Sequence, residues 1–304
     1  MAEEYQVVES TRPELGPGET LIEYPELGVQ LICSLNTDKE TMLENVRTNI
    51  RHQGLGKVWP CKPMDREDAI AIVAGGPSLL DTLDELRAAI ADGARCVSLA
   101  NATHVLLENG IRPSAQVLLD AKPRNAEFAH DVPGCTYFLA SQCDPSVFER
   151  VMSFSQMNGY SGFEAKEGQQ RIILWHAVNS DEELQAVMDL GEPWVPVQAG
   201  STITLRALRL FQILGYWRFH VFGMDSCMMG GRHHAYEQPA ADHLRVADIG
   251  CNGRRFDVTG WQIHQVMEFM KFCRLFAQEL EMSVHGDGLI AHMIRTSATQ
   301  SEAA

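Results

Sequence analysis

Apolar residues occur in short runs along the chain, and most runs are followed by a stretch with helical spacing. Residues 69–74 are apolar without interruption, which is typical of a strand buried on both faces of a parallel sheet. After the turn 75–78, leucine and isoleucine recur at the spacing of a helix, at Leu79, Leu80, Leu83, Leu86 and Ile90. The pattern therefore predicts a strand, a tight turn and a helix over residues 69–90.

The same alternation continues through most of the chain. Further strands are expected at 96–100, 115–119, 137–140 and 219–223, with weaker candidates at 172–175 and 194–197. Helices are expected at 103–108, from about 145, at 203–214 and at 261–280, before a closing strand at 282–285. Strands that alternate with helices in this way predict an α/β fold with a Rossmann-like, doubly wound, mostly parallel sheet.

The two ends of the chain differ from this pattern. Proline and glycine interrupt the short apolar pieces of residues 1–65, where we expect an N-terminal arm or cap before a Rossmann-like domain over 66–295. The glycine-rich segment after Asp225 leaves a predicted strand, so it should lie over the carboxyl edge of the sheet as a lid. Residues 296–304 are small and polar, which predicts a flexible tail.

Composition narrows the classes of protein. The net charge of −15 makes nucleic acid an unfavourable partner, because binding to its backbone needs clustered Lys and Arg. No apolar run approaches the roughly 20 residues of a membrane span, and the acidic N-terminus lacks the order of a secretory signal. The eight cysteines include no Cys-x-x-Cys pair. These features predict a cytoplasmic protein with no membrane segment and no structural zinc, and they leave a homo-oligomer open.

The turn Gly75-Gly76-Pro77-Ser78 is the first candidate binding site. Two residues without Cβ atoms allow an anion to approach the backbone, and Pro77 suits the first turn of a helix. The free N–H groups and the dipole of that helix would favour a phosphate. A plain strand-to-helix turn is the alternative interpretation.

A second helix start has a similar composition. Gly200, Ser201 and Thr202 precede the helix expected at 203–214, so they form either a second anion site or a simple cap. Arg206, one turn later, would either add positive charge or face solvent.

Polar residues follow three of the predicted strands, and their positions indicate a shared site. Asn101, Asp120 and Asp225 should meet at the carboxyl edge of the sheet, where ligands bind in open parallel sheets. The two carboxylates could hold Mg²⁺ against nucleotide phosphates or bind a ribose, and the alternative for Asp120 and Asn101 is helix capping. His233 and His234, on the expected lid, could act as a general base or phosphate contact, or lie exposed without a role.

These motifs resemble the MptE-like family (DUF115). The likeness covers roughly residues 65–240 and lies in the run 72–79, Asn101, the segment 109–113 before Asp120, the Gly200-Ser201 helix start and the run 221–225. The family's namesake is a 6-hydroxymethyl-7,8-dihydropterin diphosphokinase that uses ATP and Mg²⁺. More distant relatives are motility-associated factor glycosyltransferases and bacterial sialyltransferases, which tend to carry Asn where this chain has Gly75.

The resemblance implies a nucleotide-binding transferase domain over 66–295. Gly75–Ser78 would then bind nucleotide phosphates, Asn101 would contact the nucleotide, and Asp120 and Asp225 would lie on the metal or acceptor side. The first hypothesis is ATP-dependent phosphoryl or diphosphoryl transfer to a small hydroxymethyl-type acceptor. The alternatives are a glycosyltransferase that uses a CMP- or NDP-sugar, and a non-catalytic nucleotide-binding module of the kind that bacteriophages carry.

Overall fold

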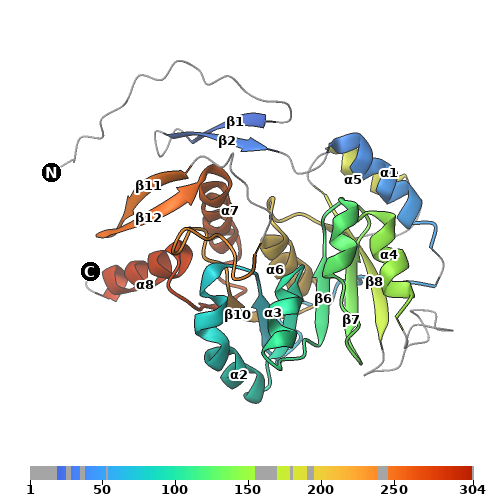
Figure 1. Ribbon diagram of the computed structural model, residues 1–304, viewed down its shortest axis with the longest axis horizontal. Coiled ribbons are helices and arrows are strands. Elements are labelled where there is room, and N and C mark those ends of the chain that lie inside the picture. The colour runs from blue at the N-terminus through green and yellow to red at the C-terminus, as the bar shows by residue number, and fades with distance from the viewer. Residues whose placement is uncertain are drawn as a thin grey trace.

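The computed structural model describes eight segments of the chain, and its central feature is one large sheet (Figure 1). The described residues are 19–24, 29–34, 38–52, 54–154, 170–178, 181–189, 195–237 and 246–302. Helices lie on both faces of the sheet, so the predicted α/β architecture is confirmed.

The sheet contains nine strands among the described residues, and every neighbouring pair is parallel. The order is β13-β10-β4-β5-β6-β7-β8-β3, with β9 beside β8. The strands are β3 (Gly56–Lys57), β4 (Ile70–Val73), β5 (Arg95–Leu99), β6 (Ala115–Leu118), β7 (Thr136–Ala140), β8 (Arg171–Ala177), β9 (Pro196–Val197), β10 (Arg218–Phe222) and β13 (Glu281–Val284). The chain runs outward from β4 to β8 and then returns to place β10 on the other side of β4. The topological switch point therefore lies between β4 and β10.

The central strand β4 shows why the sheet needs helices on both faces. Ile70 and Ile72 pack into one apolar core, while Ala71 and Val73 pack into another that includes residues of α2 and α3. The helices after β3 are α2 (Leu83–Ala91), α3 (Ala102–Glu108), α4 (Pro145–Met152), α5 (Asp181–Met188), α6 (Ile203–Ile213), α7 (Gly260–Phe276) and α8 (Leu289–Glu302). The helix predicted from Leu79 is two elements, because a 3-10 helix η2 (Pro77–Thr82) precedes α2.

The N-terminal region is partly built into the main sheet. A hairpin of β1 (Glu19–Tyr24) and β2 (Val29–Ser34) lies beside α7 (Figure 1). Helix α1 (Lys39–Asn49) covers the loop after β7, where Asn49 Nδ2 donates to the carbonyl oxygens of Ser141 at 2.9 Å and Cys143 at 2.6 Å. Strand β3 then pairs with β8. Helix α1 and strand β3 are therefore part of the main domain, rather than of the separate arm or cap that we expected over 1–65.

The C-terminal part differs from the prediction in three places. A hairpin of β11 (Val246–Cys251) and β12 (Arg254–Thr259) was missed, although its Asn252-Gly253 turn is a strong hairpin signal. Helix α7 ends at Phe276, four residues before the predicted end. Helix α8 continues to Glu302, so most of the predicted flexible tail 296–304 is helical. No helix in the described parts of the chain is long and apolar enough to cross a membrane.

Candidate functional site

A cavity of about 350 Å³ lies at the carboxyl edge of the sheet, around the switch point. It is lined by nine of the predicted site residues: Gly75, Gly76, Pro77, Asp120, Ser201, Thr202, Asp225, His233 and His234. Ser78 and Gly200 are each next in sequence to a lining residue but do not line the cavity themselves. Asn101 lies elsewhere, in a neighbouring cavity of about 770 Å³ that shares Arg124, Phe128 and Tyr236 with the first. The sheet thus gathers most of the predicted residues around one cavity, whereas Asn101 lines the adjacent one.

The turn after β4 is held by hydrogen bonds within the protein. Gly76 N–H donates to the carbonyl oxygen of Gly223 at 2.8 Å, and Ser78 N–H donates to Asp225 Oδ2 at 2.9 Å. A Cβ atom on Gly76 would lie 2.9 Å from the carbonyl carbon of Gly223 and would also meet the Asp225 carboxylate. Glycine is therefore needed here because β4 and β10 approach each other closely. Two of the amides that we expected to bind phosphate, those of Gly76 and Ser78, thus already have partners.

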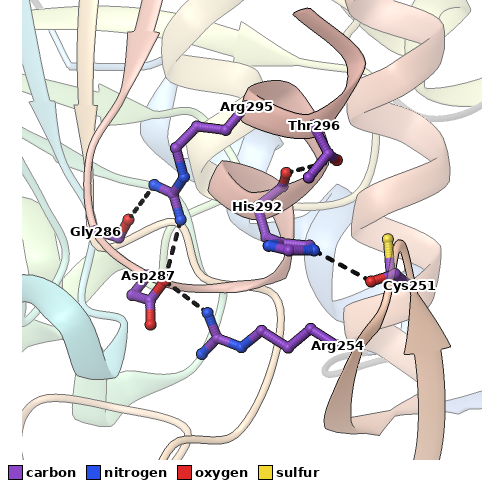
Figure 2. A network of polar contacts seen from close by, with 7 residues as sticks. All are labelled: Cys251, Arg254, Gly286, Asp287, His292, Arg295 and Thr296. Carbon is purple, nitrogen blue, oxygen red and sulfur yellow. Dashed lines mark hydrogen bonds and ion pairs between the residues drawn. The ribbon is translucent and has the colours of Figure 1, made fainter. Parts of the chain in front are cut away.

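Asp225 is a buried carboxylate that joins the turn to the loop after β13. It is 3% exposed, and burial raises its pKa against the opposing effect of hydrogen bonds from Ser78. A Cβ atom on Gly288 would lie 2.5 Å from Asp225 Cα, so this loop packs directly behind the carboxylate. Figure 2 shows how the loop is held: Asp287 Oδ1 accepts from Arg254 at 2.6 Å and from Arg295 at 3.0 Å. The surroundings of Asp225 thus fix the geometry of the turn.

The start of α6 binds a carboxylate from another part of the protein, that of Glu268 in α7. Glu268 Oε2 accepts from Ser201 N–H at 2.9 Å and from the Ser201 hydroxyl at 2.7 Å. Gly200 has a φ of +91°, and its missing Cβ leaves room for Glu268. Thr202 caps the helix by accepting from Leu205 N–H at 3.5 Å, as the capping interpretation predicted. Arg206 neither faces solvent nor adds charge to the cavity, because it is 2% exposed and donates to the carbonyl oxygens of Val178 and Val197.

Positive charge reaches the cavity from the segment after β6. Lys122 and Arg124 line it together with Asp120. Burial raises the pKa of Asp120, and the charges of Lys122 and Arg124 oppose that rise. Two side-chain cations beside one carboxylate make this the part of the cavity most suited to phosphate. The sequence analysis missed both cations, and their position two and four residues after a strand-end aspartate was the available signal.

The segment 232–237 covers the turn, as predicted for a lid. His234 Nδ1 lies 3.2 Å from the carbonyl oxygen of Gly75, and Ala235 N–H donates to the same oxygen at 2.9 Å. Because a carbonyl oxygen only accepts, Nδ1 carries the hydrogen, and Nε2 has the free lone pair. Burial and the neighbouring His233 lower the pKa of His234 to about 4. His234 is therefore a neutral proton acceptor at neutral pH, and its ring stacks on Tyr236.

Two further features of the lining were missed from the sequence. Helix α7 contributes Trp261, Gln262 and Gln265. Ala100 and Ser226, which follow β5 and β10, have φ values of +45° and +50°. Left-handed residues other than glycine are strained, and such strain is common at functional sites. Neither feature has a sequence signal of its own, since Trp261 and Gln262 fit an ordinary helix start.

Metal ligands are sparse around the cavity. Among the described residues, no group of three or more His, Cys, Asp or Glu side chains could hold a metal ion. Mg²⁺ often uses one or two carboxylates and takes its other ligands from phosphate and water. Asp120 fits that role. Asp225 has one carboxylate oxygen engaged by Ser78 and little exposed surface, so it fits less well.

Comparison with known proteins places this site in a wider context. A family model described as "6-hydroxymethylpterin diphosphokinase MptE-like" matches residues 40–231. The solved structure of the MAf glycosyltransferase from Magnetospirillum magneticum AMB-1 is similar, with a TM-score of 0.60 and 17% identity over 86% of this chain and 41% of that one. At this identity the likeness shows the fold, and the chain spans less than half of that protein.

The similarity to solved sialyltransferase structures is more remote and does not bear on the family or the fold of this chain. A mammalian sialyltransferase, solved in complex with Gal-beta-1-3GalNAc-ortho-nitrophenol, has a TM-score of 0.37 at 10% identity over 82% of this chain and 87% of that one. A TM-score at that level carries no argument. No curated protein matches the sequence.

Proposed function

The chain belongs to the MptE-like family, and from this premise we propose that it is a transferase that moves a phosphate-containing group from a nucleotide to a small hydroxyl-bearing acceptor. The observation that carries the proposal is the cavity at the switch point of the sheet, whose lining includes Asp120, Lys122 and Arg124 together with a neutral His234. A nucleotide donor and a small-molecule acceptor are thus the proposed partners.

The side-chain cations are the proposed phosphate site. The N–H groups of Gly76, Ser78 and Ser201 donate within the protein, so they offer little to a ligand. Lys122 and Arg124 carry full charges, and Arg can bind two phosphate oxygens at once. Gly75, Gly76 and Pro77 would then bound the phosphates sterically. Ser201 and Thr202 would line the opposite wall.

Mg²⁺ is the proposed cofactor for the diphosphoryl-transfer hypothesis, with ATP as donor. Asp120 would hold the ion, while Asp225 would keep the turn in place through Ser78. The ion would supply neutralisation of the phosphate charge that develops during transfer.

The proposed reaction is diphosphoryl transfer. The acceptor hydroxyl oxygen attacks the β-phosphorus of ATP, the bond from that phosphorus to the α-phosphate oxygen breaks, and AMP leaves with the electron pair. His234 Nε2 takes the hydroxyl proton, because Nδ1 is committed to Gly75. Lys122 and Arg124 stabilise the charge that develops on the phosphate oxygens. His233, beside His234, keeps the proton acceptor in place and lowers its pKa.

A binding experiment tests the phosphate site. Calorimetric titration of ATP, with and without Mg²⁺, should show at least about tenfold weaker binding to the double variant Lys122→Gln/Arg124→Gln than to the wild type, because two charge-assisted contacts are lost. Arg112→Gln, which removes an exposed charge that does not line the cavity, is the matched control. Equal affinity of the double variant and the wild type would refute the phosphate site.

A turnover experiment tests the reaction. Mass spectrometry of a mixture with ATP, Mg²⁺ and 6-hydroxymethyl-7,8-dihydropterin should show AMP and a diphosphate ester. His234→Ala should slow the reaction by a factor on the order of 10² or more. Nucleotide binding without turnover across a panel of donors and acceptors would identify a non-catalytic module.

Glycosyl transfer from a CMP- or NDP-sugar is the second candidate. The observation that favours it is the small number of metal ligands among the described residues, beside two side-chain cations able to neutralise a leaving nucleotide. Glycosyl transfer would be supported if the protein releases CMP or UDP from a nucleotide sugar in the presence of EDTA and does not consume ATP.

A further inference from the structure

The α7 end of the cavity contains an amide group that lacks a complete set of partners. Gln262 is 1% exposed and lines the cavity. Its Oε1 accepts from Thr259 N–H at 2.9 Å and from the Thr259 hydroxyl at 3.2 Å. Because a backbone N–H only donates, the oxygen must face Thr259, and Nε2 must point the other way. None of the hydrogen bonds of Gln262 among the described residues uses Nε2, so its two hydrogens are available to a ligand in the cavity.

The other residues of α7 that line the cavity, Trp261 and Gln265, carry no formal charge. Trp261 is half-buried and lines the cavity, with its ring 6.5 Å from that of His233, whose pKa burial lowers. The other amide side chain of α7 that lines the cavity, Gln265, has a partner on each side, since it accepts from Ser226 at 2.7 Å and donates to Thr202 at 3.2 Å. Of these two amides, Gln262 is therefore the one whose Nε2 has no partner among the described residues.

Negative charge lies just outside this end of the cavity. Glu268 approaches the start of α6 through Ser201, and hydrogen bonds from His264 and Ser201 lower its pKa although burial opposes them. An ionised carboxylate here disfavours an anionic ligand group. The cavity lining thus combines cations, at Lys122 and Arg124, with an uncharged aromatic and amide surface contributed by α7 at Trp261 and Gln262.

We propose that Trp261 and Gln262 form a subsite for an uncharged planar heterocycle. The ring would stack on Trp261, and one of its carbonyl oxygens or ring nitrogens would accept from Gln262 Nε2. Either the base of the nucleotide donor or a heterocyclic acceptor has this chemistry. The inference rests on the proposed function, which places the phosphates at Lys122 and Arg124 in the same cavity.

The variant Gln262→Glu tests the subsite without removing the helix start. A glutamate at this position can still accept from Thr259 N–H, as in common capping boxes, but it has no amide hydrogens. Gln262→Met is the uncharged companion variant. Gln185→Glu, on the exposed surface of α5, is the control for the change in net charge. CMP, AMP, ribose 5-phosphate and 6-hydroxymethylpterin are the probes in calorimetric titrations at pH 8.

If the subsite binds the donor base, CMP or AMP will bind at least tenfold more tightly than ribose 5-phosphate to the wild type and to Gln185→Glu. Both Gln262 variants will lose that advantage, and Gln262→Met will keep the affinity for ribose 5-phosphate. If it binds a heterocyclic acceptor, the nucleotides will gain nothing over ribose 5-phosphate. In that case 6-hydroxymethylpterin will bind, and its affinity will fall at least tenfold in both variants.

Two results would overturn the subsite: no heterocycle binds the wild type better than ribose 5-phosphate, or the Gln262 variants bind every probe as the wild type does. Trp261→Leu gives a second test if a Gln262 variant does not fold, since it should weaken the same probes and spare ribose 5-phosphate. If phosphate binding depends on Lys122 and Arg124 while nothing depends on Gln262, the subsite fails and the proposed function stands. If the pterin binds through Gln262 but no phosphate compound binds, the subsite stands and the proposed function fails.

Discussion

The two glycines of the turn after β4 make a matched pair of substitutions, because they meet different neighbours. A Cβ atom on Gly76 would meet the backbone of Gly223 at 2.9 Å and the carboxylate of Asp225. A Cβ atom on Gly75 would meet only the end of the Tyr236 side chain, at 2.6 Å from Cε1 and 2.8 Å from the hydroxyl. A side chain can rotate away, whereas two paired strands cannot separate cheaply. We therefore expect Gly76→Ala to destabilise the protein much more than Gly75→Ala.

The expected loss in the free energy of unfolding for Gly76→Ala follows from the contacts of the turn. Separation of the strands at Gly76 breaks its hydrogen bond to Gly223 and strains the one from Ser78 to Asp225. A neutral hydrogen bond and one to a carboxylate together contribute about 2.5–4 kcal/mol. In a chain of this size the melting temperature should fall on the order of 5–10 °C. Gly75→Ala should cost about 1 kcal/mol or less, because only Tyr236 has to move.

Guanidinium unfolding followed by circular dichroism measures both free energies of unfolding, and ATP titration measures the effect on the cavity. Gly75→Ala should keep its stability but lose affinity for ATP, because Tyr236 forms part of the lining. The reasoning is refuted if Gly76→Ala unfolds within about 0.5 kcal/mol of the wild type, or if Gly75→Ala is the less stable of the two.

Three further predictions address the parts around the cavity. Asn49→Asp replaces the donor to Ser141 and Cys143 with an acceptor, and it should lower the free energy of unfolding by about 2–4 kcal/mol in urea titrations. His234 has a pKa of about 4, below that of an unfolded histidine, so its contribution to stability is complete above pH 6.5 and is lost as the pH falls toward 4. His234→Ala should therefore lose less stability than the wild type between pH 7 and pH 5 in guanidinium unfolding, and equal losses would count against the assignment. The pKa of Glu268 is lowered, so Glu268→Gln should cost about 1 kcal/mol near pH 7 and progressively less below pH 4.5, as melting curves at several pH values would show.

The sequence predicted the sheet well because its strands are buried on both faces. Runs such as 70–73 and 137–140 are apolar throughout, and a parallel sheet gives each of them the same signal. The convergence of Gly75, Asp120 and Asp225 followed directly, since the carboxyl ends of parallel strands share one edge. Elements with weaker periodicity, such as the β11–β12 hairpin and helix α8, were missed.

The chemistry of the site was less predictable, because it depends on which groups already have partners. Glycine followed by serine at a helix start reads equally as an anion site or as a packed turn. Only the positions of Asp225 and Glu268, contributed from distant parts of the chain, distinguish the two. Gln262 gave no signal at all, since its importance lies in one hydrogen bond to Thr259 and in what that bond leaves free.

The pairing of β3 with β8 has a consequence for how the chain reaches its final form. Gly56 lies beside Ile173, so strand β3 can pair only after the much later strand β8 is present. Contacts between residues so distant in sequence slow folding, because the entropy cost of closing a long loop comes before the contacts can stabilise the structure. During synthesis the edge of the sheet would therefore be completed only after β8 has left the ribosome. A shortened protein that begins after residue 65 would leave that edge exposed and ready to pair with another molecule.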